Sequence, residues 1–127
     1  MHTLVYSDDP AATRTFFRDV LRWPFVSDDG EGAVGDDWLI FRSGLSEVGV
    51  HPTTSERGGE TRTTARHHDL TLMCDDIAAT AAELRGRGAA IGGEPQDRGF
   101  GLAVMVVVPG ADPVMLYEPR HRVAYGL

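Results

Sequence analysis

The side chains best suited to chemistry lie on segments whose pattern predicts strands. Alternate residues of a strand face the same side. If Val5 packs under a helix, His2 and Tyr6 share the opposite face, and Glu47 likewise shares a face with His51. Imidazole and carboxylate groups bind divalent metals and transfer protons, so such faces are candidate metal or acid–base sites. A third set on one face comprises His67, Asp69, Thr71 and Met73.

A second group of side chains is aromatic or carries a thioether. A surface of this kind binds a flat or polarisable molecule without any metal. For each member the alternative is a structural role, in which the side chain only fills the interior. The group comprises Tyr6, Trp38, Met73, Phe100, Met115 and Tyr117. Together with His51 and His67, these are the predicted ligand-binding residues.

The elements that position these residues occur in two copies. The segment Asp8–Thr13 returns as Asp75–Thr80 with a constant offset of 67 residues, and Arg18 keeps that offset to Arg85. An offset near half the chain length indicates two copies of one supersecondary unit, not an array of short repeats. Two such units facing each other leave a cleft, and ligands prefer clefts of that kind.

Each copy predicts one helix. Asp9 is placed to cap the first helix, with Pro10 at its first position, and Pro24 ends it. Asp76 is placed to cap the second helix, and glycines at 86 and 88 stop it. In both segments the apolar residues recur with helical spacing.

Strand-like segments complete each copy and give the order strand, helix, strand, strand, strand. They lie near residues 4–6, 25–26, 38–41 and 48–50, and near residues 70–74, 90–91, 102–108 and 114–117. The sequence predicts an α+β fold of two tandem β-α-β-β-β modules. The single domain, residues 1–127, divides into a first module at about 1–52, a polar linker at about 53–66, a second module at about 67–119 and a tail at 120–127.

Composition excludes several classes of function. The 127 residues are 42% hydrophobic and 24% charged, as in an ordinary globular domain. A net charge of −7 argues against binding to duplex nucleic acid. The longest apolar run, Leu102–Val108, is too short to span a membrane, and Asp8 comes too early for a secretory signal. One cysteine permits no intrachain disulfide, which favours a cytoplasmic location.

The chain resembles the vicinal oxygen chelate superfamily, which includes glyoxalase I, bleomycin-resistance proteins, fosfomycin-resistance enzymes and extradiol dioxygenases. The resemblance covers nearly the whole chain. It implies that each module is a curved mixed sheet with a helix on its outer face, and that the two modules face a shared cavity. The motifs that carry it are Phe16–Leu21, Met73–Ile77, Ala82–Gly88, Pro109–Pro113 and Leu116–Pro119.

The resemblance also implies a divalent metal site, for Zn, Ni, Mn, Fe or Mg. Its positions fall on His2, Glu47 and Asp69, and the fourth falls on Met115, whose thioether is a poor ligand for these ions. Three protein ligands can still make an open site. The alternative is structural, with His2 solvated near the N-terminus and Glu47 in a turn.

Three functions remain open. The first is binding of a small organic molecule in the shared cavity, as in bleomycin-resistance proteins, with a degraded metal site. The second is a metal-dependent lyase or isomerase similar to glyoxalase I, or a dioxygenase, with Glu47 as the catalytic base. The third is a scaffold with a vestigial cavity. The expected partner is a small molecule rather than nucleic acid or a membrane, and the resemblance implies a homodimer. Binding is favoured over catalysis.

Overall fold

The computed structural model describes residues 3, 5–27, 39–49 and 52–123. Within these ranges a short α-helix leads into a π-helix, a second α-helix follows later, and eight strands form three sheets. In chain order the elements are α1 (Pro10–Thr15), η1 (Phe16–Val20), β1 (Phe25–Ser27), β2 (Leu39–Phe41), β3 (Thr54–Arg57), β4 (Glu60–Thr63), β5 (Thr71–Met73), α2 (Ile77–Gly86), β6 (Gln96–Asp97), β7 (Gly101–Val106) and β8 (Val114–Pro119).

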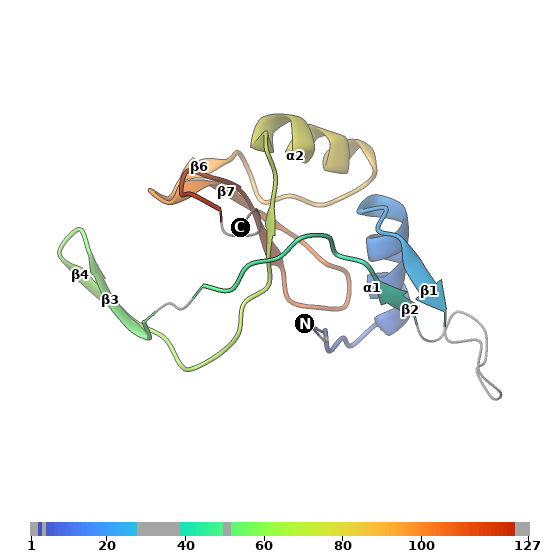
Figure 1. Ribbon diagram of the computed structural model, residues 1–127, viewed down its shortest axis with the longest axis horizontal. Coiled ribbons are helices and arrows are strands. Elements are labelled where there is room, and N and C mark those ends of the chain that lie inside the picture. Colours follow the sequence, from blue (N-terminus) through green and yellow to red (C-terminus); the bar gives the residue numbers. More distant parts are fainter. Residues whose placement is uncertain (1–2, 4, 28–38, 50–51, 124–127) are drawn as a thin grey trace.

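The second half of the chain forms one four-stranded sheet. Its strand order is β5-β8-β7-β6, with β5 parallel to β8 and the other neighbours antiparallel. Along the chain, α2 lies between β5 and β6, and it covers one face of the sheet (Figure 1). The order strand, helix and three strands, expected from the repeat, is therefore present in this half. The strand expected near residues 90–91 is only a bridge between Ile91 and Val106, and β6 lies further along the chain.

Both α-helices begin where the sequence predicts. The Asp9 carboxylate accepts a hydrogen bond from the Ala12 N–H at 3.0 Å, and the Asp76 carboxylate accepts one from the Ala79 N–H at 2.9 Å. Each bond pairs a backbone donor that the first turn of a helix leaves open. In the described part of the chain, no helix is long and apolar enough to span a bilayer.

The described part of the first half has fewer strands than the repeat predicts. Its described strands β1 and β2 form an antiparallel pair. The segments 4–6 and 48–50, expected as strands, are irregular at their described positions, and Tyr6 and Val48 are 88% and 73% exposed. Here the structure differs from the expectation because a short apolar alternation forms a strand only where a neighbouring strand supplies hydrogen-bond partners.

A β-hairpin occupies part of the stretch predicted as a linker. The strands β3 and β4 pair through a turn at Gly58 and Gly59, whose φ angles are +61° and +81°. Two positive φ angles match the twist of a hairpin, and glycine adopts them without strain. The hairpin projects from the body at the left of Figure 1. The strands carry Thr, Ser, Glu and Arg and no apolar face, which is why hydrophobic periodicity did not predict them.

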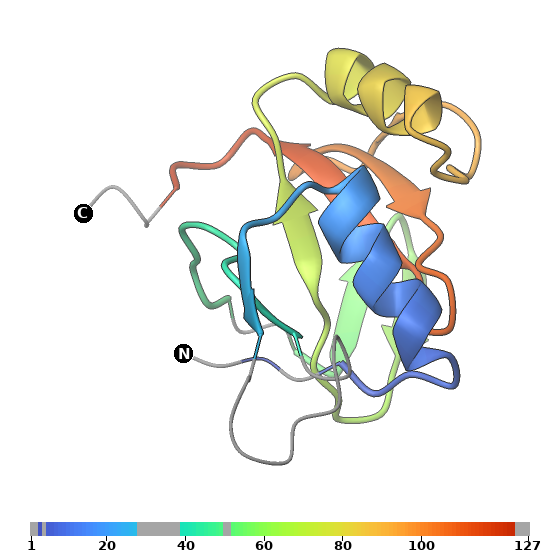
Figure 2. The ribbon, with the colours of Figure 1, turned by 90° about the vertical axis from the view of Figure 1, so that its right-hand side faces the viewer.

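A hydrophobic core joins the two halves. Phe16 and Phe17 of η1 are 4% and 8% exposed, and they pack with side chains from α2, β7 and β8. Figure 2 shows the first helix lying across the strands of the second half, with α2 beside it. One sheet therefore supports the helices of both repeats. The other buried core residues come from this sheet, from α2 and from the segment just after β7. They are Ile77, Leu84, Val104, Val106, Val108, Val114 and Leu116.

A polar contact joins the ends of the two helical segments. The guanidinium of Arg87, just after α2, donates to the carbonyl oxygen of Val20 at 2.9 Å, and it also pairs with Glu83. The Arg87 side chain thus satisfies a carbonyl at the end of η1 that has no helical partner. Val20 and Arg87 are separated by 67 residues, the offset of the sequence repeat.

A hydrogen-bonded junction fixes the N-terminal end of α1 to the turn between β7 and β8. The Thr13 hydroxyl, in a residue only 5% exposed, donates to the Pro109 carbonyl at 2.5 Å and lies 2.8 Å from Ser7 Oγ. Ser7 Oγ donates to the Gly110 carbonyl at 2.8 Å, and the Asp8 N–H donates to the same oxygen at 2.8 Å. The junction holds the two halves together at a second place, apart from the apolar core.

Replacing Thr13 with valine tests this junction. The variant keeps the side-chain shape but leaves the Pro109 carbonyl without its donor, so we expect a loss of about 1–3 kcal/mol in the free energy of unfolding. Urea denaturation followed by tryptophan fluorescence measures it. Thr15→Val, at an exposed position of the same helix, is the matched control and should change stability by less than about 0.5 kcal/mol. Equal losses in the two variants would contradict the assigned role.

Gly101 marks a close approach between β7 and β8. A Cβ atom there would overlap the Glu118 carbonyl oxygen, whereas a Cβ at Gly86 would meet nothing within 4 Å. We expect Gly101→Ala to force the strands apart and to destabilise the fold by about 1–3 kcal/mol. Gly86→Ala should leave stability unchanged or slightly increased. Thermal unfolding of the two variants checks this, and a Gly101→Ala protein as stable as the parent would show that the strands yield easily.

Cys74 follows β5 on the helix side of the sheet, as the alternation predicts, and packs against the core. Its thiol donates to the Tyr117 carbonyl at 3.6 Å. Burial raises the pKa of this thiol because the apolar surroundings disfavour the thiolate.

We therefore expect iodoacetamide to alkylate Cys74 at least ~10-fold more slowly in the folded protein than in urea. The folded state favours the protonated thiol. The stability gained from burying the protonated Cys74 thiol is therefore complete below the pKa that this thiol has in the unfolded chain. It is lost as the pH rises through the pKa of the thiol in the folded protein. Mass spectrometry of the time course measures the rates, and equal rates in the two states would contradict the assignment.

Candidate functional site

The sheet face opposite the helices carries a row of methionines. Val104 and Leu116 are paired across β7 and β8 and belong to the core, so their chain neighbours point to the other face. Register extends this face to β5, where Thr71 lies opposite Met115. We call this surface the methionine face and define it as Thr71, Met73, Ala103, Met105, Met115 and Tyr117.

Three thioethers give this face its chemistry. Met73 and Met115 were both predicted from the sequence to contact ligand, and both are half-buried. Met105, 41% exposed, lies opposite Met115 in the register and was not predicted. The signal for it was present, because Val104 and Val106 on the core side place Met105 on the other side. Thioethers are polarisable and adapt to flat partners, so the face suits an aromatic molecule.

Aromatic rings flank the methionines at one end. The rings of Phe100 and Tyr117, both predicted ligand-binding residues, lie edge to face, with centroids 5.6 Å apart and planes at 81°. Tyr117 is 8% exposed and Phe100 is 44% exposed. Phe100, in the loop before β7, is therefore accessible to a ligand, whereas the ring of Tyr117 beside it is buried.

Polar side chains from both halves of the chain meet at Nε2 of His121. Tyr117 Oη lies 3.3 Å from Nε2 of His121, and the same nitrogen lies 3.7 Å from Oε1 of Glu47. The Glu47 side chain is 18% exposed and that of His121 is 39% exposed. We call Glu47, Tyr117 and His121 the polar cluster.

The sequence predicted Glu47 and Tyr117 as site residues but placed His121 in the tail at 120–127. The contact of His121 with Glu47 joins positions far apart in the chain. No local spacing encodes such a contact, because it depends on the path of the segment after β2 relative to the end of β8.

Asp69 and His67 form a separate pair at the start of β5. His67 Nε2 lies 3.2 Å from the Asp69 carboxylate, and the other ring nitrogen bonds to the Ala65 carbonyl at 2.7 Å. Both hydrogen bonds raise the pKa of His67, and the bond to Ala65 has the larger effect. The side chains of His67 and Asp69 are 47% and 77% exposed, so this is a solvated pair.

The remaining predicted site residues lie elsewhere. Tyr6 is 88% exposed and borders a shallow polar hollow of about 250 Å³ beside Gly110. His2, Trp38 and His51 lie outside the described residues.

The two described donors of the expected metal site, Glu47 and Asp69, have different partners. Glu47 belongs to the polar cluster, and Asp69 pairs with His67. Across the described ranges, no three His, Cys, Asp or Glu side chains gather closely enough to hold a metal ion. The described residues therefore do not fit a metal by themselves, and a complete site would need a ligand from outside them.

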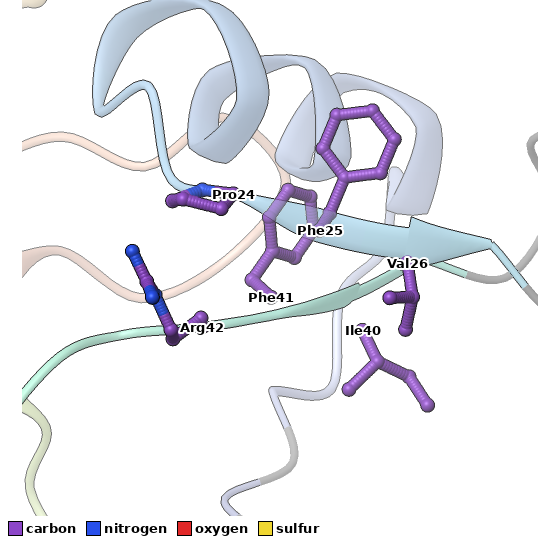
Figure 3. Close-up of a pocket in the computed structure, with 6 residues that line it drawn as sticks. All are labelled: Pro24, Phe25, Val26, Ile40, Phe41 and Arg42. Carbon is purple, nitrogen blue, oxygen red and sulfur yellow. The ribbon is translucent and has the colours of Figure 1, made fainter.

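A larger hollow, of about 400 Å³, lies along the β1–β2 ribbon. In Figure 3 the rings of Phe25 and Phe41 lie on the helix side of this ribbon, whereas Val26 and Ile40 lie on the other side. The residues that line this hollow lie on both faces of the two strands. The hollow therefore runs around the edge of the ribbon and does not enclose a ligand. The methionine face, with the polar cluster at its end, is the better candidate site.

Two solved structures share the fold of this chain. TnmS3, an antibiotic binding protein from Streptomyces sp. CB03234, aligns with a TM-score of 0.55 and 20% identity over 91% of this chain and 90% of its own. Lactoylglutathione lyase from Agrobacterium tumefaciens aligns with a TM-score of 0.58 and 16% identity over 93% and 91%. At these identities the likeness extends to the fold alone. No curated protein matches the sequence.

The family is established by the sequence itself. The family model of the Glyoxalase/Bleomycin resistance protein/Dioxygenase superfamily matches residues 1–119, which includes both repeats. This match confirms the resemblance drawn from the sequence motifs, and the α+β architecture agrees with it. The chain belongs to the glyoxalase, bleomycin-resistance and dioxygenase superfamily.

Proposed function

We propose that this protein binds a flat, largely apolar small molecule on the methionine face, as a binding protein of the bleomycin-resistance type. The observation that carries the proposal is that Met73, Met105 and Met115 share one face of three paired strands, with Phe100 accessible at one end. The paired strands fix the backbone positions of these side chains, so an aromatic ring can lie across them without rearrangement of the backbone.

The comparison with TnmS3 supports binding without chemistry. That protein is described as an antibiotic binding protein, and it shares the architecture that presents the methionine face here. The resemblance to the superfamily implies that Met115 stands where its metal-dependent members have a ligand. A methionine there favours contact with an apolar ligand over coordination of a hard divalent ion.

The proposal includes a homodimer in the cytoplasm. Leu45 and Val48 of the first half are 74% and 73% exposed, and large apolar side chains this exposed suit a subunit contact. The single cysteine, Cys74, is a free thiol, in keeping with a reducing compartment.

Replacing Met115 with lysine tests the location of the ligand. We expect flat polycyclic probes such as acridine and anthraquinone to bind the wild-type protein in the presence of EDTA. Met115→Lys should weaken this binding by at least ~10-fold, because the ligand would cover an ammonium group without a partner. Fluorescence titration gives the dissociation constants, and the melting temperature of the free variant shows that it is folded.

Val26→Lys is the matched control on the β1–β2 ribbon. This variant should bind the probes like the wild type, and binding lost in it but retained in Met115→Lys would place the ligand at the ribbon and contradict the proposal. A probe that binds only after addition of one equivalent of Zn, Ni, Mn, Fe or Mg, with the effect lost in Glu47→Gln, would instead support a metal-dependent lyase, isomerase or dioxygenase.

A further inference from the structure

The polar cluster lies next to the aromatic end of the methionine face and shares Tyr117 with it. The Tyr117 ring contacts Phe100 on one side, and its centroid lies 6.1 Å from that of the His121 ring. A molecule that lies on the methionines and reaches Phe100 therefore ends near the side chains of His121 and Glu47. Its polar substituents at that end determine how well it fits.

Hydrogen bonding fixes the orientation of the His121 ring. Its Nδ1 lies 3.1 Å from the carbonyl oxygen of Arg122. A carbonyl only accepts, so Nδ1 carries a proton. In the neutral ring Nε2 then carries the lone pair, and the Tyr117 hydroxyl donates to it across 3.3 Å.

The neighbouring atom of Glu47 is also an acceptor. Its Oε1 lies 3.7 Å from His121 Nε2, which is too long for a direct hydrogen bond. A polar contact of this length accommodates a third polar atom near both groups. An ionised carboxylate only accepts and has about four lone-pair positions, so the atom that suits this place is a donor.

We propose, resting on the proposed function, that the ligand is a planar aromatic molecule with a hydroxyl or amino group, which donates a hydrogen bond to Glu47 while the ring system lies on the methionine face. Glu47 is the binding residue. His121 is a positioning residue, because its ring holds the Tyr117 hydroxyl and lines the approach to the carboxylate. The methionines and Phe100 favour flat ligands, and Glu47 favours ligands that carry a hydrogen-bond donor.

A matched pair of probes tests this inference. 2-Naphthol carries a donor hydroxyl, and 2-methoxynaphthalene has the same rings without the donor. With EDTA present, we expect the wild-type protein to bind 2-naphthol at least ~10-fold more tightly, since a hydrogen bond to a charged group contributes that much or more. Glu47→Gln should reduce this preference to less than ~3-fold by weakening 2-naphthol binding alone, because a neutral amide accepts a weaker bond than a carboxylate.

His121→Phe keeps a ring beside Tyr117 and removes both nitrogens, so it should lower the preference for 2-naphthol while binding of 2-methoxynaphthalene stays within ~2-fold of wild type. Glu56→Gln on β3 and His68→Phe before β5 make the same chemical changes at exposed positions and should leave the preference unchanged. Fluorescence titration of the naphthalene probes measures these five proteins and Met115→Lys, and their melting temperatures report folding.

The outcomes separate the two proposals. Equal affinity of the wild-type protein for both probes, or a preference that survives Glu47→Gln, would overturn the donor inference and leave binding on the methionine face intact. Failure of both probes to bind, or binding of both that Met115→Lys does not weaken, would overturn the proposed function together with the inference.

Discussion

The fold depends on the burial of Phe16 and Phe17 against the sheet of the other half of the chain. Both rings are almost inaccessible, and their neighbours include Val104 and Leu116 at the centre of the four-stranded sheet. Burial of two such side chains contributes several kcal/mol, a large share of the net stability of a domain of this size. Because both helices occupy one face of the sheet, the other face carries the methionines.

The position of the candidate site follows from this arrangement. Alternation along β7 and β8 places valine and leucine toward the helices, so methionine and tyrosine point away from them. A sheet whose register is fixed by a well-packed face also fixes the spacing of side chains on its open face. The polar cluster lies at one end of this face, where Glu47 of the first half contacts His121, whose ring also bonds to the Tyr117 hydroxyl.

Local physical rules predicted most of the second half of the chain and less of the first. Asp76 caps α2, and the alternation in β8 separates Leu116 from Tyr117, because capping and strand parity depend on residues close in sequence. The hairpin at Gly58 and Gly59 lacked the apolar pattern on which the strand predictions relied. His121 was missed since its contact with Glu47 depends on how distant segments pass one another.

The hydrogen bond from Arg87 to Val20 also bears on how the two repeats are related. Under the 67-residue offset, position 20 of the first repeat is the counterpart of position 87 of the second, so the bond joins two equivalent places. In a symmetric pair, a residue meets its own counterpart only beside the rotation axis. Here the contact between counterparts occurs at the ends of the two helical segments, whereas the described strands of the two halves pair differently.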